Sequence, residues 1–291
     1  MDRRSLLRVL GIGGLGLAGA ALGGCAQVSP VPRPSPVAPL PIGTDGTGPG
    51  DALSAILLAA LAARQQPASV VPQPLDTAVV AVGEGSPLVM GVYGWTTLQR
   101  RLAAEEPPPS EELITTLATV VAPEVNVLRA SGVDGALLWA APKRTVTSLS
   151  MVRKALREGV LATPSWGLTN AAGVPALEAA YGVSLPTLTI EDAAARRAAL
   201  DDGTAHLALF RRTDSLELDG LQLLEDPIGI ETPDPLVVIV SATLAEEHPT
   251  ALLALGAAMA ALTQEAFAEL RGRLATDPQA AAAWVTTAGL G

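Results

Sequence analysis

Residues 160–214 alternate short apolar runs with helical segments, and this alternation constrains the fold more than any other part of the sequence. Apolar runs that predict strands cover 160–163, 185–190 and 206–210. The segments between them, 173–182 and 190–203, have the periodicity and the terminal glycines of short amphipathic helices. Strands that alternate with helices of about ten residues predict an α/β fold, with a mostly parallel sheet covered by helices.

The same stretch carries a family resemblance. The segments GVPALEAAYGV (173–183) and LDDGTAHLAL (200–209), followed by Thr213-Asp214, resemble the second lobe of osmoprotectant-type substrate-binding proteins. These proteins deliver glycine betaine, carnitine or choline to ABC importers. The resemblance extends over roughly residues 50–291 and implies a two-lobed clamshell of the type II periplasmic-binding-protein architecture, in which the chain crosses between the lobes twice.

The N-terminus has the features of an export signal. Two arginines (Arg3 and Arg4) precede a run of small and apolar residues, and residues 22–25 resemble a bacterial lipobox. We therefore expect residues 1–24 to be a signal peptide and Cys25, the single cysteine, to be lipidated, which would anchor the protein to the outer face of the cell membrane. The alternative is a simple Sec signal with a chance cysteine, and the choice between Sec and twin-arginine export stays open.

Residues 25–50 are rich in proline, glycine and serine, a composition that cannot form a core and is typical of a semi-rigid spacer. Beyond this lipid-anchored linker we expect a first lobe from residues 51–140 and 235–291 and a second lobe from residues 141–234. The crossovers are expected near 139–145 and 228–236. The helical pattern of residues 249–289 predicts a layer that packs on the first lobe.

The sequence contains no catalytic or metal-binding constellation. It lacks a nucleophile-elbow motif, and its two histidines, His206 and His248, are far apart and are expected to be a core and a surface residue. No spacing of His, Cys and carboxylates suggests a metal ion, so we expect neither an enzyme nor a cofactor. The net charge of −10 and the absence of a basic stripe argue against a nucleic-acid partner.

A receptor for quaternary amines needs aromatic faces, because a trimethylammonium group has no N–H and is held by cation–π contacts. Tyr181, Phe267 and Trp284 lie on helix faces and are expected in the core. The remaining candidates for the ligand site are Tyr93, Trp95, Trp166 and Phe210. Tyr93 matches a tyrosine that lines the cleft in the family, and Trp166 matches the aromatic residue of the family's Pro-x-aromatic loop. Simple packing at the base of a loop is the alternative for each.

At several positions the sequence departs from the family pattern. Thr169 and Asn170 stand where the family usually has an arginine, and Arg211 and Arg212 stand where it often has an aromatic residue and a serine. Arg211 could receive a carboxylate or another anion, whereas two cations at the cleft edge would oppose a cationic ligand unless they point away. Asp134 could supply a charge partner or simply stabilise a turn. An incomplete aromatic cage predicts weak or altered binding of betaine.

The sequence therefore predicts an exported solute-binding lipoprotein of an ABC importer, with a small quaternary amine as ligand and the permease and ATPase subunits as partners. It would contact the membrane only through its lipid anchor. One alternative is a degenerate lipoprotein that kept the fold for a structural or regulatory role and transports no ligand. An enzyme on a similar two-lobed scaffold is a further alternative, which the lack of a catalytic constellation disfavours.

Overall fold

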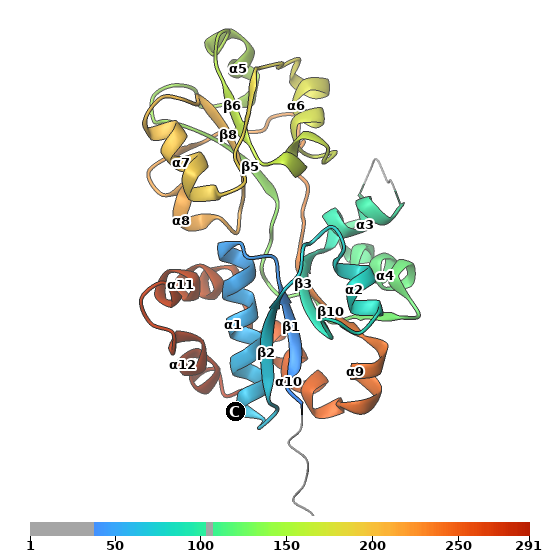
Figure 1. Cartoon of the computed structure of the whole chain (residues 1–291). Coiled ribbons are helices and arrows are strands. Elements are labelled where there is room, and N and C mark those ends of the chain that lie inside the picture. Colours follow the sequence, from blue (N-terminus) through green and yellow to red (C-terminus); the bar gives the residue numbers. More distant parts are fainter. Residues whose placement is uncertain (1–37, 103–106) are drawn as a thin grey trace, which may run out of the picture. The chain divides into compact units, whose positions relative to one another are not determined.

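The structure, a computed structural model, describes residues 38–102 and 107–291 (Figure 1). The predicted signal peptide, the lipidation of Cys25 and most of the predicted linker lie outside these residues. Residues 37–291 form one compact unit. In the part of the chain that is described, no helix combines the length and the apolar character needed to cross a membrane.

The strands form two five-stranded sheets. The first sheet has the order β2-β1-β3-β10-β4 and consists of β1 (Leu40–Thr44), β2 (Ala68–Pro72), β3 (Val89–Tyr93), β4 (Val125–Val127) and β10 (Leu236–Ser241). The second sheet has the order β7-β6-β8-β5-β9 and consists of β5 (Leu137–Ala141), β6 (Leu161–Thr163), β7 (Thr187–Thr189), β8 (Leu207–Arg211) and β9 (Gln222–Leu223). The predicted two-lobed α/β architecture is confirmed.

The sheets are mixed, not mostly parallel as predicted. β1 pairs in parallel with β2 and β3, and β6 pairs in parallel with β7 and β8. β10 and β5, the strands that receive the chain from the other sheet, are antiparallel to both of their neighbours. Two consecutive strands of one sheet can pair in parallel only if a crossover connection returns the chain to the end of the sheet where the first strand began. β5 and β10 enter directly from the other sheet and have no such connection.

The chain passes from the first sheet to the second through residues 128–136 and returns through residues 224–235. The first connection lies earlier than the predicted 139–145, because β5 already pairs with β8 in the second sheet. The two connections bond to each other: the amide of Gly135 donates to the carbonyl of Asp234 (2.8 Å), and that of Asp234 donates to Oδ1 of Asp134 (2.8 Å).

Helices cover both faces of the first sheet (Figure 1). The helices on the two faces are α1 (Gly48–Ala63), α2 (Ala78–Gly83), α3 (Gly94–Leu102), α4 (Ser110–Val121), α9 (Ala242–Glu247), α10 (Pro249–Ala261), α11 (Gln264–Leu274) and α12 (Ala280–Thr287). Along β10, Val238 and Val240 pack with α1 and α10, whereas Val237 and Ile239 pack with α3 and α4. This alternation follows from the period of two in a strand, and it explains why β10 is apolar throughout.

The second sheet is covered by α5 (Leu149–Ala155), the short 3-10 helix η1 (Ser165–Leu168), α6 (Val174–Tyr181), α7 (Ala193–Asp201) and α8 (Ser215–Leu218). Helix α6 ends at Gly182, which adopts the left-handed conformation (φ 61°) that favours glycine. Helix α7 begins after Asp192, whose side chain accepts the amide of Ala195 (2.8 Å) as an N-cap.

The first lobe begins earlier than predicted. Residues 40–44 form β1, and α1 starts at Gly48 with Thr47 as its N-cap, although residues up to 50 are expected from the sequence to be linker. Leu40 and Ile42 are buried in the core of the first sheet, so this part of the Pro-rich segment has an apolar face that the core can bury.

Candidate functional site

A cavity of about 410 Å³ is lined by residues that follow the carboxyl ends of strands in both sheets. The lining comprises Asp45–Pro49 after β1, Leu75, Tyr93 at the end of β3, Trp166 in η1, Glu191–Ala193 and Arg196 at α7, Arg211 at the end of β8, Asp214 after it, Glu217 in α8 and Arg271 in α11. The carboxyl ends of strands are where α/β folds typically place their ligands, because the loops there are free of the sheet's own packing.

Arg211 is stacked between two aromatic rings of this cavity. Its guanidinium carbon lies 3.9 Å from the ring centroid of Tyr93 and 4.4 Å from that of Trp166. The residue is only 5 % exposed, and both contacts are within the range in which a cation is attracted to an aromatic face. The aromatic pair formed by Tyr93 and Trp166 therefore already holds a cation that belongs to the chain itself.

Hydrogen bonds fix the guanidinium of Arg211 in this position. Nη1 donates to Oδ2 of Asp234 and to the carbonyl of Gly135, both at 3.0 Å, and Nη2 donates to Oγ1 of Thr96 at 3.2 Å. Asp234 and Gly135 belong to the two connections between the sheets. One side chain of the second sheet thus contacts both connections and the start of α3.

Asp234 organises the polar groups behind Arg211. Its carboxylate accepts the amides of Trp95 (2.8 Å) and Thr96 (3.1 Å), as well as the hydroxyl of Thr96 (2.5 Å). Because α3 begins at Gly94, these bonds satisfy the free amides of the first turn of a helix, where a negative charge is also favoured by the helix dipole. Asp234 is 2 % exposed, so these donors and Arg211 replace the water that a buried carboxylate loses.

Tyr93 is held by its hydroxyl as well as by its ring. The hydroxyl lies 2.8 Å from Oγ1 of Thr213, which follows β8 in the second sheet. Burial raises the pKa of Tyr93 far above its usual value, since a phenolate would lose its hydration. The residue is therefore a neutral hydroxyl that joins β3 to the loop after β8.

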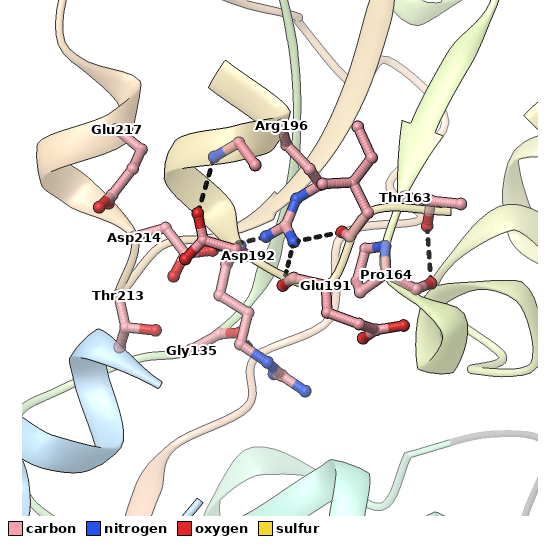
Figure 2. A network of polar contacts seen from close by, with 12 residues as sticks. Gly135, Thr163, Pro164, Glu191, Asp192, Arg196, Thr213, Asp214 and Glu217 are labelled. Carbon is pink, nitrogen blue, oxygen red and sulfur yellow. Dashed lines mark hydrogen bonds and ion pairs between the residues drawn. The ribbon is translucent and has the colours of Figure 1, made fainter. Parts of the chain in front are cut away.

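A second buried arginine lies at the start of α7. The guanidinium of Arg196 is 3.3 Å from Oδ2 of Asp214 and donates to the carbonyls of Ile190 (3.0 Å) and Glu191 (2.7 Å). Figure 2 shows Arg196 beside Asp214 and Glu191. Burial lowers the pKa of Arg196 and raises the pKa of Asp214; their mutual attraction opposes both shifts. The pair fixes the loop before α7 against the loop after β8.

A third arginine connects a helix on the first sheet to a helix on the second. Arg271 in α11 forms a bidentate ion pair with Glu217 in α8, with N–O distances of 2.7 and 2.6 Å, and also donates to the carbonyl of Thr213 (3.1 Å). Each of the three arginines of the lining is thus matched by a carboxylate. The lining contains three further carboxylates: Asp45 and Asp192 accept amides of their own loops, from Thr47 and Ala195, and Glu191 accepts the amide of Ser165 in η1.

The residues predicted for the ligand site divide into two groups. Tyr93, Trp166 and Arg211 lie together at the cavity. Asn170 lies just behind them, buried, with Nδ2 at 3.4 Å from Oγ1 of Thr96. Thr169 is exposed and only contacts the carbonyl of Trp166 (3.4 Å).

The other predicted residues lie elsewhere. Trp95 and Phe210 are buried in hydrophobic clusters and do not line the cavity, so their prediction as ligand-site residues is wrong. Trp95 is the second residue of α3, whose apolar face packs on the first sheet. Phe210 lies on one face of β8, and Leu209 lies on the other. Asp134 stabilises a turn by accepting the amide of Ala136 (3.0 Å), and it also pairs with Arg212 (3.6 Å).

Several residues of the site were not anticipated from the sequence. Asp234, Arg196, Glu217 and Arg271 were missed because each acts through a partner that is distant in sequence; Asp234 and Trp95 are 139 positions apart. Asp214 was noted only as part of a family-typical Thr-Asp pair. A usable signal was the acidic residue in the predicted return crossover, where a buried charge needs a partner from a neighbouring lobe.

Replacing Gly135 with alanine is expected to destabilise the protein by about 1–3 kcal/mol through overpacking. A methyl group at this position would overlap the ring of Tyr93 and would lie 3.2 Å from the carbonyl oxygen of Asp234. Urea unfolding measures the change. Gly256→Ala, in the interior of α10 with open space around the added carbon, is the matched control and should be neutral or stabilising. Equal effects of both substitutions would contradict the packing of Gly135 against Tyr93.

Comparison with protein families gives a match over residues 116–287, more than half of the chain, to the substrate-binding domain of ABC-type glycine betaine transport systems. The chain belongs to this family. It is therefore a substrate-binding protein of the glycine betaine transport type, and the sequence resemblance noted above is confirmed. The family's members bind solutes and are not enzymes. A comparison with curated protein sequences gives no match.

Solved structures of ABC-transporter proteins for glycine betaine or choline share the fold of this protein. A glycine betaine/carnitine/choline ABC transporter structure matches with a TM-score of 0.67 at 15 % identity, covering 86 % of this chain and 99 % of the other. Lactococcal OpuAC, in a closed form with glycine betaine, matches at 0.60 and 13 % identity, covering 85 % and 95 %. A choline-binding protein of an ABC transporter, in complex with choline, also matches at 0.60 and 13 % identity, covering 85 % and 88 %.

Proposed function

We propose that this protein is the exported solute-binding lipoprotein of an ABC importer, and that it binds a small osmoprotectant-like quaternary amine in the cavity beside Tyr93 and Trp166. Its anchor would be a lipid on Cys25, its location the outer face of the cell membrane, and its partners a permease and an ATPase. The observation that carries the ligand class is the spacing of the two rings, which lie 3.9 and 4.4 Å from one and the same cationic group.

The chemistry of the lining supports a cationic or zwitterionic ligand. It contains five carboxylates and three guanidinium groups, so its charge balance is negative. A cation is attracted by this balance and by the electron-rich faces of the two rings. The ligand would be enclosed by movement of the lobes about the connections 128–136 and 224–235, and its differential affinity for the closed form would drive that movement.

The second candidate function is a binding-protein fold that transports no ligand and has a structural or regulatory role. Arg211 favours it, because this side chain occupies the space between the two rings that a quaternary ammonium would need. The ion pairs Arg211–Asp234 and Arg271–Glu217 also hold the two sheets together without any ligand.

Thermal unfolding of the chain from residue 26 onward distinguishes these functions. Since residues 37–291 form one compact unit, this chain retains the whole site. Betaine, choline, carnitine, proline betaine, amino acids and small anions would be tested, each in large excess. A ligand at 100- to 1,000-fold its dissociation constant should stabilise the fold by about 3–4 kcal/mol, which appears as a rise in Tm.

The rise in Tm should disappear in Tyr93→Ala and in Trp166→Ala and should persist in Trp284→Phe, a change in α12 outside the cavity lining. A shift with anions alone would contradict the quaternary amine and move the ligand to the arginines. No shift with any compound would support the non-transporting alternative.

A further inference from the structure

We propose that Arg211 is the specificity-determining residue of this site: it acts as a built-in cation that competes with an external cation for the faces of Tyr93 and Trp166. This inference rests on the proposed function and names what controls access to that same site. A quaternary ammonium reaches both rings only when the guanidinium of Arg211 has left them.

The geometry leaves no room for two cations. The guanidinium lies on both rings at once, at 3.9 and 4.4 Å, and Arg211 is 5 % exposed. These distances correspond to direct contact between the planar group and each ring, so a trimethylammonium group cannot be inserted between them. Removing the side chain at Cβ would open a space bounded by the two rings and, at its inner end, by Asp234.

The chemistry of the space that Arg211 occupies defines the ligand that would replace it. Arg211 donates hydrogen bonds to Asp234, Gly135 and Thr96 in addition to its ring contacts. A quaternary ammonium supplies the charge but has no N–H, so it leaves these acceptors without the donors they now have. A guanidinium compound supplies both. We therefore infer that the vacated site prefers methylguanidinium to tetramethylammonium, and that the native chain binds both weakly.

Displacement costs more than the ring contacts alone. Without Arg211 the carboxylate of Asp234 keeps three donors, from Trp95 and Thr96, but loses its ion-pair partner. A buried carboxylate without a counter-charge is unfavourable, so either Arg211 stays or another cation takes its place. The affinity of the native chain for an external cation is thus reduced by the stability of the internal contact.

Isothermal titration calorimetry of the chain from residue 26, native and with Arg211→Ala, tests this inference with methylguanidinium, tetramethylammonium and choline as probes. Arg211→Ala should bind each probe at least tenfold more tightly than the native chain, with methylguanidinium bound most tightly. Arg212→Ala is the matched control. It removes the neighbouring arginine, which faces Asp134 and Glu231 at 41 % side-chain exposure, and should leave all affinities unchanged.

Thermal unfolding of the same proteins keeps the test valid if Arg211→Ala is unstable. Methylguanidinium at millimolar concentration should raise the Tm of Arg211→Ala and should not raise that of Arg212→Ala. Arg211→Met, which refills the space with an uncharged chain, should show neither rescue nor tighter binding. The absence of rescue in Arg211→Ala, together with unchanged affinities, would overturn the inference.

The outcomes separate this inference from the proposed function. Tight binding of choline by the native chain with weaker binding by Arg211→Ala would overturn the inference and leave the function standing. No binding by the native chain with clear binding by Arg211→Ala would support the inference and exclude a quaternary amine as native cargo. No binding of any probe by either protein would overturn the inference, and thermal unfolding with betaine, carnitine and the other compounds of the panel would decide the function.

Discussion

Asp234→Ala is expected to lower the free energy of unfolding by about 3–5 kcal/mol, the range found when one partner of a buried ion pair is removed. The substitution leaves the buried guanidinium of Arg211 without its carboxylate. It also removes the acceptor of the Trp95 and Thr96 amides at the start of α3. Urea unfolding followed by circular dichroism measures the loss.

Two control substitutions make this result specific. Asp234→Asn keeps an oxygen for the α3 amides but not the charge, so its cost should be smaller than that of Asp234→Ala. Glu231→Ala removes the carboxylate of the exposed pair with Arg212 and should cost at most about 1 kcal/mol. A loss below about 1 kcal/mol for Asp234→Ala would contradict the description of Asp234 as the centre of the buried network.

Trp95→Ala is expected to cost about 3–5 kcal/mol, because a large aromatic side chain that is 2 % exposed would leave a cavity in the core. Trp95 packs in the hydrophobic cluster between the first sheet and helices α2, α3 and α4, not in the ligand cavity. Denaturant unfolding measures the loss of stability, and Trp166→Ala is the comparison. Trp166 is half-buried at the cavity, so its removal should cost less stability and more ligand affinity.

Binding data on a milder variant complete this test. Trp95→Phe keeps most of the packing and should bind the same ligands as the native chain with unchanged affinity. A protein that stays stable but loses ligand affinity at residue 95 would contradict the placement of Trp95 in the core and would restore the original interpretation of the sequence.

Much of the fold could be predicted because strands and helices alternate with clear periodicity. The predicted helix 173–182 corresponds to α6, and its end at Gly182 follows from a residue that tolerates φ of 61°. Strand β1 was missed because its residues lie in a Pro-rich segment, and β9, with two residues, is too short to show any periodicity. The antiparallel strands β5 and β10 depend on how the chain enters each sheet, which no local pattern records.

The candidate site could be predicted only where the type of a side chain by itself indicates its role, as an aromatic ring does for a cationic ligand. Tyr93 and Trp166 were selected as aromatic faces, and they do line the cavity; their contact with a ligand stays a prediction. Trp95 is two positions from Tyr93 and was selected for the same reason, but the change from strand to helix at Gly94 directs it into the core. The position of Arg211 between the two rings depends on Asp234, which is 23 positions away, and sequence spacing alone does not reveal such a pair.

Hydrogen-exchange mass spectrometry of the chain from residue 26, with and without the compound that raises the Tm most, tests the central claim that a solute binds in this cavity. We predict that the ligand slows exchange in the segments that line the cavity or lie directly behind it, residues 45–49, 91–98, 163–170, 190–196, 209–214 and 232–236. Protection confined to other segments, for example to residues 274–278 and the exposed side of α1, would contradict the claim. So would a complete absence of protection with every compound of the panel.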